Sequence, residues 1–436
     1  MEASLGLYLL LIFLFFIFVG VPIAIAIGVS SVLVMLSVIP YNVVAITSGQ
    51  KLATGIDSFS LLAVPFFVLA GNIMNQGGIA TRLVNFAYLF VGKVPGSLCH
   101  VNVLSNMMFG SVSGSAVAAA AAVGKTLLPE VKSAKIDVNT ATAVNIASCP
   151  TGMLIPPSNG LIVYSVVSGG TSIGALFLAG YIPGILMGLS CMVVAYIIFK
   201  LKPSLAGVNL NNSFTLKQIA IVTWQAIPSL GLILVVIGSI IGGICTATEA
   251  ACMAVLYSLF LSLLYRTIDL KILKTISKDT VLISGVVLFL IGASTIMSYI
   301  MAYAHIPQTV SKAILSITNN KILILLLINI ILLVVGMFMD MTPAILIFTP
   351  IFLPIAKTIG IDPVHFGIIM CFNLCIGIVT PPVGTALFVG CSVSGAKIER
   401  VIKPLLPLIL AEIFILFLIT YVSSLSLAIP RYFGFV

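Results

Sequence analysis

The sequence predicts an all-α protein that crosses a membrane many times. Of its 436 residues, 61% are apolar and only 7% are charged, and the mean hydropathy is +1.28. A soluble domain carries roughly a quarter of its residues as charged side chains. Six long segments contain no Asp, Glu, Lys or Arg, namely 3–50, 58–81, 94–124, 138–199, 218–248 and 280–311. At about 20 residues for each crossing, the apolar segments predict roughly ten to twelve spans.

Residues 1–29 are expected to remain in the protein as its first helix. They carry no positive residue before Leu5, and their apolar run is too long for the core of a signal peptide. Neither this segment nor 230–243 alternates apolar and polar residues as a transmembrane strand does. The spans are therefore predicted to be helices rather than strands of a barrel.

The net charge of +9 is explained by topology and needs no nucleic-acid partner. Basic residues gather in two connections, the first with Lys200, Lys202 and Lys217 and the second with Arg266, Lys271, Lys274 and Lys278. The segment 218–265 between them is long enough for two crossings, so both connections lie on one side of the membrane. We assign that side to the cytoplasm.

An internal repeat relates two parts of the chain. A shift of 225 positions superimposes seven identical residues in the window 129–157, among them Asp137 on Asp362, Gly152 on Gly377 and Pro156-Pro157 on Pro381-Pro382. Duplicated segments with matching helix breaks are typical of secondary transporters, whose binding sites lie where the halves meet. We expect the two halves to be inverted in the membrane.

The repeat predicts four parts of the chain. These are N-terminal scaffold helices at 1–50, a first repeat with a hairpin and a broken helix at 51–200, a central scaffold hairpin with basic cytoplasmic loops at 201–279, and a second repeat with a hairpin, a broken helix and a C-terminal helix at 280–436. The largest connection, 201–217, is expected to be a loop.

Each repeat contains a Pro-Pro pair deep in an uncharged stretch, Pro156-Pro157 and Pro381-Pro382. Two successive prolines remove two backbone donors and break a helix. A break at membrane depth leaves carbonyl groups that must be satisfied by protein, water or a cation. A simple kink is the alternative interpretation of either pair taken alone.

The segment 110–115 is rich in small hydroxyl residues and includes Ser111, Ser113 and Ser115. Uncharged oxygens suit a weakly held monovalent cation such as Na⁺. Close helix packing by small residues is the alternative, and it alone accounts for the alanines at 116–122. A nucleophilic role for Ser113 is a further alternative, but no recognisable base accompanies it.

Asp340 stands at the repeat position of Ser115, between the apolar runs 322–339 and 341–356. An ionisable residue in such a segment is a functional candidate because its unpaired burial is expensive. We expect a cation and the unwound backbone near Thr380 to accompany it. The alternative is an Asp that caps a helix. Glu249 and Glu412 are assigned structural or interfacial roles.

Ordered motifs along nearly the whole chain resemble one transporter family. In the first half they are Gly77-Gly78-Ile79-Ala80, Val91-Gly92, Pro95-Gly96, Phe109-Gly110, Ser113-Gly114-Ser115, Pro129 and Ile155-Pro156-Pro157-Ser158. In the second half they are Asp340, Pro350, Pro354, Gly360-Ile361-Asp362-Pro363, His365-Phe366-Gly367, Asn373 and Thr380-Pro381-Pro382-Val383-Gly384. Together they resemble the large membrane subunit of tripartite ATP-independent periplasmic (TRAP) transporters, part of the ion-transporter superfamily.

The resemblance implies an elevator-type symporter with re-entrant hairpins and two Na⁺ sites. The first sodium site is implied at Ser113 and Ser115 with the backbone of Gly152, Ile155 and Pro157. The second sodium site is implied at Asp340 and Thr342 with Gly377, Thr380 and Pro382. The substrate is expected between them, and Ser158 and Gly384 are its candidate contacts.

The resemblance also implies a location and partners. The expected location is a bacterial inner membrane, where the chain contacts lipid. The expected partners are a separate small four-helix membrane subunit and a periplasmic binding protein that delivers an organic acid. The predicted function is therefore sodium-coupled carboxylate import, without enzymatic activity. A stand-alone sodium- or proton-coupled carboxylate carrier is the alternative, and a membrane hydrolase or a passive channel is a further one.

Overall fold

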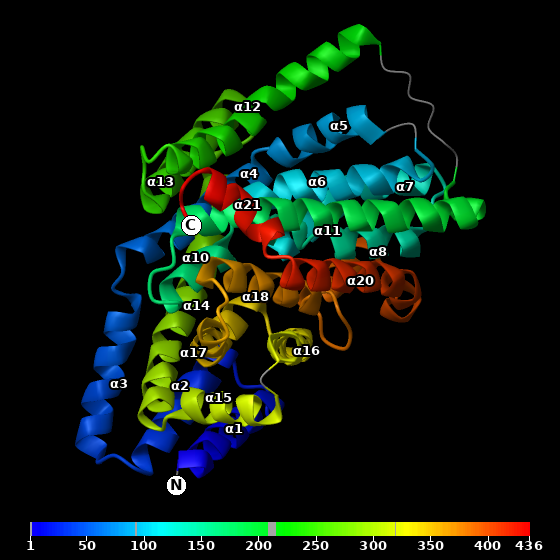
Figure 1. The fold of residues 1–436 in the computed structure, drawn as a ribbon. Helices are drawn as coiled ribbons and strands as arrows, with labels where there is room; N and C mark the ends of the chain where they lie inside the picture. Colours follow the sequence, from blue (N-terminus) through cyan, green and yellow to red (C-terminus); the bar gives the residue numbers. More distant parts are fainter. Residues whose placement is uncertain (1, 92–93, 208–214, 319) are drawn as a thin grey trace.

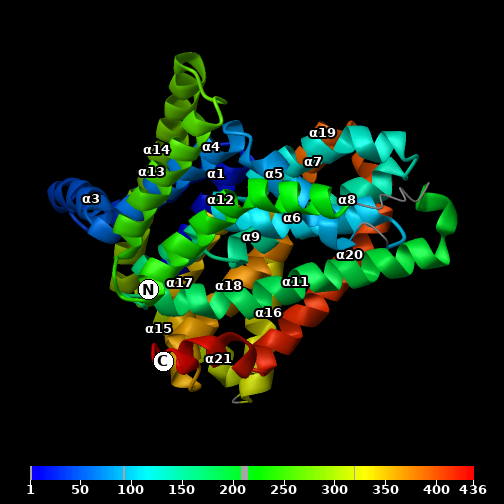
Figure 2. The same ribbon diagram turned by 90° about the horizontal axis from the view of Figure 1, so that it is seen from above.

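The computed structural model describes residues 2–91, 94–207, 215–318 and 320–436 (Figures 1 and 2). Every regular element in those ranges is an α-helix or a 3₁₀-helix, so the all-helical prediction is confirmed. Gly92 of the predicted motif and residues 208–214 of the predicted loop lie outside the described residues. The described flanks of that loop are the end of one helix, a 3₁₀ turn and the start of the next helix.

The helices follow one another in two series. The first series is α1 (Glu2–Phe18), α2 (Ile23–Leu36), α3 (Tyr41–Ile56), η1 (Phe59–Leu62), α4 (Ala63–Gln76), α5 (Ile79–Val91), α6 (Ser97–Ser113), α7 (Ala116–Ser133), α8 (Val138–Ser148), α9 (Thr151–Leu154), α10 (Asn159–Val167) and α11 (Ile173–Leu201). The second is η2 (Pro203–Leu205), α12 (Leu216–Ile241), α13 (Ala247–Leu264), α14 (Leu270–Tyr303), α15 (Ile306–Ile317), α16 (Lys321–Phe338), α17 (Met341–Thr358), α18 (Pro363–Gly377), α19 (Thr385–Ser394), α20 (Ile398–Tyr421) and α21 (Ser424–Tyr432).

Helix boundaries recur at the spacing of the sequence repeat. Helix α11 begins at Ile173 and α20 at Ile398, 225 positions later, and α7 and α17 begin with the same separation. Corresponding helices also share their caps. Asp137 accepts a hydrogen bond from the backbone N–H of Thr140 at 2.8 Å at the start of α8, and Asp362 accepts one from Val364 at 2.7 Å at the start of α18. Each cap satisfies a backbone donor that the first turn leaves free.

Eight helices in the described ranges are long and apolar enough to cross a membrane, fewer than the ten to twelve predicted. They are Phe59–Gln76, Ile173–Leu201, Leu216–Ile241, Ala247–Leu264, Leu270–Tyr303, Lys321–Phe338, Met341–Thr358 and Ile398–Tyr421. Five further apolar helices are shorter than such a span: Leu5–Phe18, Ile23–Leu36, Thr81–Val91, Pro363–Gly377 and Thr385–Ser394. The number of spans was predicted from the total apolar length. The chain divides part of that length among helices shorter than a membrane span, so fewer helices reach spanning length.

The prediction of one helix over residues 1–29 is wrong. The chain forms α1 and α2 with a turn between them, where Gly20 has a φ of +85° and Pro22 precedes the first residue of α2. Glycine adopts this left-handed conformation without steric cost, and proline removes a backbone donor. The two helices contact each other, so the segment folds back as a hairpin.

Long helices occupy the middle of the molecule. Figure 1 shows α6, α11, α18 and α20 running across the centre, with α12 and α13 on one side and α1, α2, α3 and α15 on the other. The two flanking groups make corresponding contacts in the two halves of the repeat: α13 packs on α4 on one side, and α2 packs on α14 on the other. The predicted site residues lie at the ends of α6, α9, α17 and α18 and in the turns beside these ends.

Candidate functional site

The turn between α6 and α7 contains the first group of predicted residues. Gly114 ends α6 with a φ of +60°, which reverses the chain between the two serines. The hydroxyl of Ser115 accepts a hydrogen bond from the N–H of Ala118 at 3.3 Å and so caps α7. Ser113 is buried, and its hydroxyl makes only long hydrogen bonds, 3.5 Å to the Gly110 carbonyl and 3.4 Å to the Ser115 carbonyl.

The first Pro-Pro pair interrupts a helix. Helix α9 ends at Leu154 and α10 begins at Asn159, with Pro156 and Pro157 between them. In a continuous helix the carbonyl of Gly152 would accept a hydrogen bond from residue 156, but proline has no N–H to donate. The Ser158 hydroxyl donates to the carbonyl of Met153. The break thus leaves a backbone carbonyl available at Gly152.

Close contacts at two glycines place the turn between α6 and α7 against the first Pro-Pro break. A Cβ atom added to Gly152 would lie 2.1 Å from the Cα of Gly110, so the backbones of α6 and α9 are in direct contact. A Cβ on Gly114 would lie 3.4 Å from the carbonyl oxygen of Pro157. The structure therefore brings the Ser113–Ser115 turn beside the carbonyls of the first break.

The second half repeats this contact. A Cβ on Gly377 would lie 2.4 Å from the Cα of Gly336, where α16 meets the end of α18. Pro381 removes the donor for the Gly377 carbonyl, which accepts a shorter-range bond from the N–H of Thr380 at 3.0 Å. The Thr380 hydroxyl donates to the Ile376 carbonyl at 2.6 Å, which leaves its oxygen lone pairs free.

Asp340 lies at the N-cap position of α17, but its side chain makes no capping hydrogen bond. Asp340 is exposed as a whole residue, and Thr342 follows it in the first turn of the helix. The structure therefore does not show the side-chain capping bond that the alternative interpretation of Asp340 predicts. Both residues face the cavity described below.

The two breaks differ in exposure. Residues 155–158 of the first break are all buried, whereas Pro382 and Val383 of the second are exposed. Gly384, next in the chain, has a φ of +30° and is so close to the carbonyl oxygens of Ile378 and Thr380 that a Cβ would lie 3.0 Å from each. Equivalent segments of the repeat thus face different surroundings in this conformation.

A cavity of about 180 Å³ joins parts of both halves. Its lining includes Ser113, Ser115, Asp340 and Thr342 from the predicted sites. Six other predicted residues are outside the described lining and lie behind it or at the second break: Gly152, Ile155, Pro157, Gly377, Thr380 and Pro382. The candidate substrate residues Ser158 and Gly384 are also outside it.

Three helix N-termini point residues of their first turns into the cavity. These are the N-termini of α7 with Ala118, of α10 with Gly160 and of α17 with Thr342. The contact between the halves is tight, because a Cβ on Gly160 would lie 2.1 Å from the terminal carbon of Met341. Helix N-termini carry partial positive charge and favour anions. Among the described lining residues, Asp340 alone is charged.

Two asparagines of the cavity were missed by the sequence prediction. Asn159 begins α10, directly after the first break, and its buried Oδ1 has no hydrogen-bond partner among the described residues. Asn72 comes from α4 and donates to the Thr280 hydroxyl at 3.0 Å. An amide next to the Pro-Pro pair in an uncharged stretch was a usable signal for Asn159, whereas Asn72 needed the tertiary fold.

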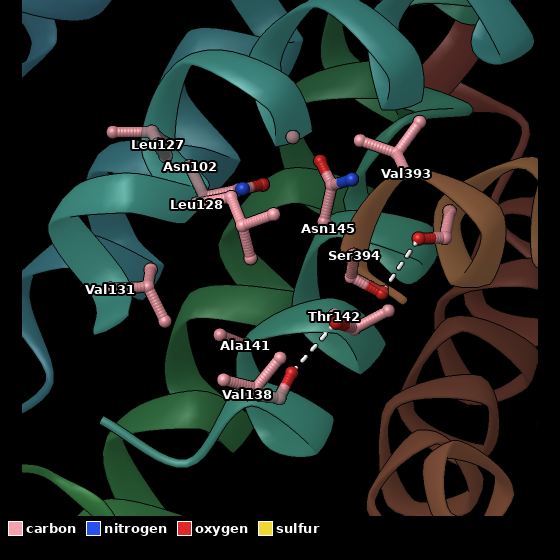
Figure 3. A pocket seen from close by; sticks show the side chains of 12 residues that line it. Asn102, Leu127, Leu128, Val131, Val138, Ala141, Thr142, Asn145, Val393 and Ser394 are labelled. Atoms are coloured by element: carbon pink, nitrogen blue, oxygen red, sulfur yellow. Dashed lines mark hydrogen bonds between the residues drawn. The ribbon is translucent and has the colours of Figure 1, made fainter. Parts of the chain in front are cut away.

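A second, smaller pocket lies between α6, α7, α8 and α19 (Figure 3). Asn102 and Asn145 point into the same region there, and Asn145 donates to the Ala120 carbonyl at 2.9 Å. The pocket holds about 20 Å³, which is room for about one water molecule. It is therefore too small for an organic substrate.

Comparison with known proteins identifies the family. The model described as "Tripartite ATP-independent periplasmic transporter, DctM component" matches residues 10–425. This chain belongs to that family. The DctM-type chain is therefore a multi-pass membrane permease and not an enzyme, so the hydrolase alternative for Ser113 is set aside.

Relatives of the permease cover most of its length. It is 52% identical to "Uncharacterized protein YgiK" of Salmonella typhimurium, over 93% of this chain and 92% of the relative. It is 39% identical to the sialic acid TRAP transporter large permease protein SiaM of Vibrio cholerae, over 88% and 90%. The Alcanivorax borkumensis YdaH transporter has a similar fold, with a TM-score of 0.65, 13% identity and coverage of 92% and 90%.

Proposed function

We propose that this TRAP permease imports an organic acid in symport with Na⁺. The observation that carries the proposal is the cavity in which three helix N-termini, Asp340 and two serine hydroxyls meet. Helix N-termini attract the anionic group of an acid, and the described lining offers no basic side chain that would hold it permanently. Such a site binds an anion yet can release it.

Charge explains why a cation would accompany the substrate. An organic acid beside Asp340 places two negative charges in a cavity between membrane helices, where low polarity strengthens their repulsion. A bound Na⁺ offsets that repulsion, so sodium and acid bind together more readily than either binds alone. This linkage couples uptake to the sodium gradient without ATP.

The donor groups suit Na⁺ at both proposed sites. At the first sodium site, Ser113 has only long hydrogen bonds among the described residues, the Gly152 carbonyl lacks its helical donor, and the Pro157 carbonyl lies beside Gly114. Ser115 and Ile155 complete the first set. At the second sodium site, Asp340 has no capping bond and Thr380 retains free lone pairs. Thr342, Gly377 and Pro382 complete the second set.

We further propose that the two halves are inverted and that a mobile domain moves as an elevator. This domain would contain the hairpins and broken helices of 51–200 and 280–436, sliding against scaffold helices in 1–50 and 201–279. The unequal exposure of the two breaks supports alternating access, because only the second is open in this conformation. In the opposite state we expect the first break to be exposed.

The family description supports a three-part assembly in a bacterial inner membrane. We propose a small four-helix membrane subunit and a periplasmic binding protein as partners. The binding protein would hand over the acid, since this chain is helical membrane protein throughout its described ranges. The relative SiaM is named for transport of sialic acid, an organic acid.

Reconstitution of the permease with both partners into liposomes tests the proposal. We expect accumulation of the acid with an inward sodium gradient and none after collapse of that gradient. Asp340→Asn should abolish accumulation, whereas Glu249→Gln should retain it, because Glu249 is exposed and caps its own helix. Unchanged accumulation without a sodium gradient would refute the coupling. Accumulation without a binding protein would instead favour a stand-alone carrier.

A further inference from the structure

A further cavity shares none of its described lining residues with the cavity at Asp340. It has a volume of about 330 Å³ and is formed by the start of α8, the end of α11 with η2, and the start of α20. These segments contact one another and lie at the same side of the molecule in Figure 1. Three basic side chains line it: Lys202, Arg400 and Lys403.

The acidic residue of this cavity is already engaged. Oδ2 of Asp137 accepts hydrogen bonds from the backbone N–H of Thr140 at 2.8 Å and from its hydroxyl at 2.7 Å. Oδ1 accepts one from the Asn139 amide at 3.3 Å. The carboxylate thus serves as a helix cap, and the three basic residues give the cavity a net positive charge.

The walls of the cavity are apolar. They are formed by Ile198, Leu201, Leu205, Pro404 and Pro407. Exposed apolar residues continue from the cavity along both membrane-spanning helices: Ile197 and Val193 on α11, and Leu406 and Leu410 on α20. The site therefore combines a positive end with two apolar surfaces that run toward the membrane interior.

We propose that this cavity binds the phosphate headgroup of an anionic phospholipid. The phosphate oxygens would accept charge-assisted hydrogen bonds from Lys202, Arg400 and Lys403, and the planar guanidinium of Arg400 can donate two in parallel. The acyl chains would lie along α11 and α20. Basic pockets between membrane helices bind such headgroups, whereas free phosphate would gain nothing from the apolar surfaces.

The site links two elements of the first half to the second half. The N–H of Asp137 donates to the Leu205 carbonyl at 3.1 Å, so the start of α8 is already tied to η2, which follows α11. A phosphate held by Lys202 and Arg400 would connect this pair to α20. We therefore expect bound lipid to raise the thermal stability of the permease.

Native mass spectrometry of the purified full chain tests this proposal. The probes are phosphatidylglycerol, phosphatidylcholine and inorganic phosphate at equal concentration. The variant Lys202→Gln/Arg400→Gln/Lys403→Gln is compared with Lys271→Gln/Lys274→Gln/Lys278→Gln, which removes the same charge from exposed positions at the start of α14. We expect the pocket variant to retain about 100-fold less phosphatidylglycerol than the wild type, because each of the three basic residues near an anionic lipid contributes about a five-fold effect.

The control variant should keep wild-type retention of phosphatidylglycerol, and phosphatidylcholine should not distinguish the two variants. The proposal would be overturned if both triple variants lost the same amount of bound phosphatidylglycerol, or if neither lost any. The basic residues of the cavity would then have a role in membrane topology only. Displacement of phosphatidylglycerol by inorganic phosphate at millimolar concentration would overturn the lipid assignment. The single variant Arg400→Gln, with an intermediate loss expected, provides a second measurement if the triple variant does not fold.

Discussion

Replacement of Gly152 by alanine tests whether the contact between α6 and α9 builds the first sodium site. The new Cβ would lie 2.1 Å from the Cα and 2.3 Å from the carbonyl carbon of Gly110. Carbon atoms in contact are about 3.5–4.0 Å apart, so the two backbones must separate by more than about 1 Å. Overpacking of this kind costs about 1–3 kcal/mol. The separation also moves Ser113 and Ser115 away from the carbonyls of the first break.

Thermal unfolding of the purified permease in NaCl and in KCl at equal ionic strength measures the effect. A ligand at 100 times its Kd stabilises a protein by about 2.7 kcal/mol, so the wild type should unfold at a higher temperature in NaCl. Gly152→Ala should lower stability in both salts and lose the sodium-dependent difference. Gly238→Ala is the control, because a Cβ at this position in α12 meets no atom of the described residues within 4 Å. Wild-type stability and a wild-type sodium response in Gly152→Ala would refute the reasoning.

Three further substitutions and one control variant separate binding from folding. Asp340→Asn keeps a residue that suits an N-cap, so it should fold normally but lose sodium-dependent stabilisation in the same assay. Ser115→Ala and Ser172→Ala each remove a helix cap worth about 1 kcal/mol of stability. Only Ser115→Ala should abolish the sodium-dependent stabilisation. Loss of that stabilisation in both variants would indicate that Ser115 acts as a helix cap alone. Asn159→Ala should raise the apparent KM for the acid about five-fold in liposomes, the value of one hydrogen bond, with sodium dependence retained; an unchanged KM would exclude a substrate contact.

The sequence predicted features that proline and glycine impose locally. Proline has no N–H, so the ends of α9 and α18 near the two Pro-Pro pairs were predictable from the pairs alone. The helix boundaries around Asp340 also followed from the apolar runs that flank it. The turn at Gly20 was missed because hydropathy registers only that 1–29 is apolar, not that a glycine and a proline end one helix and begin another.

Features that depend on tertiary contact were not predictable. The small residues at 110–115 were equally compatible with packing, and only the backbone contact between Gly110 and Gly152 shows that they lie beside a break. The inclusion of Asn72 in the cavity requires α4 to lie against α14, which no local pattern encodes. The difference in exposure between the two breaks belongs to one conformation, whereas both sequences share the glycine and the Pro-Pro pair.

Glu412 illustrates the same limit. Its expected structural or interfacial role rested on the absence of a repeat partner and of a nearby break. In the structure the side chain is fully buried, and one of its oxygens accepts a hydrogen bond from the Cys191 thiol at 3.3 Å. The burial follows from contact between α20 and α11, two helices that are distant in the sequence.

Direct binding of ²²Na⁺ to the purified permease in equilibrium dialysis tests the central claim, that the turns and breaks of both halves hold sodium. We expect saturable binding that excess K⁺ does not displace and that falls in Ser113→Ala and Asp340→Asn but not in Glu249→Gln. Binding of equal strength in all four proteins, or no saturable binding in the wild type, would contradict the account.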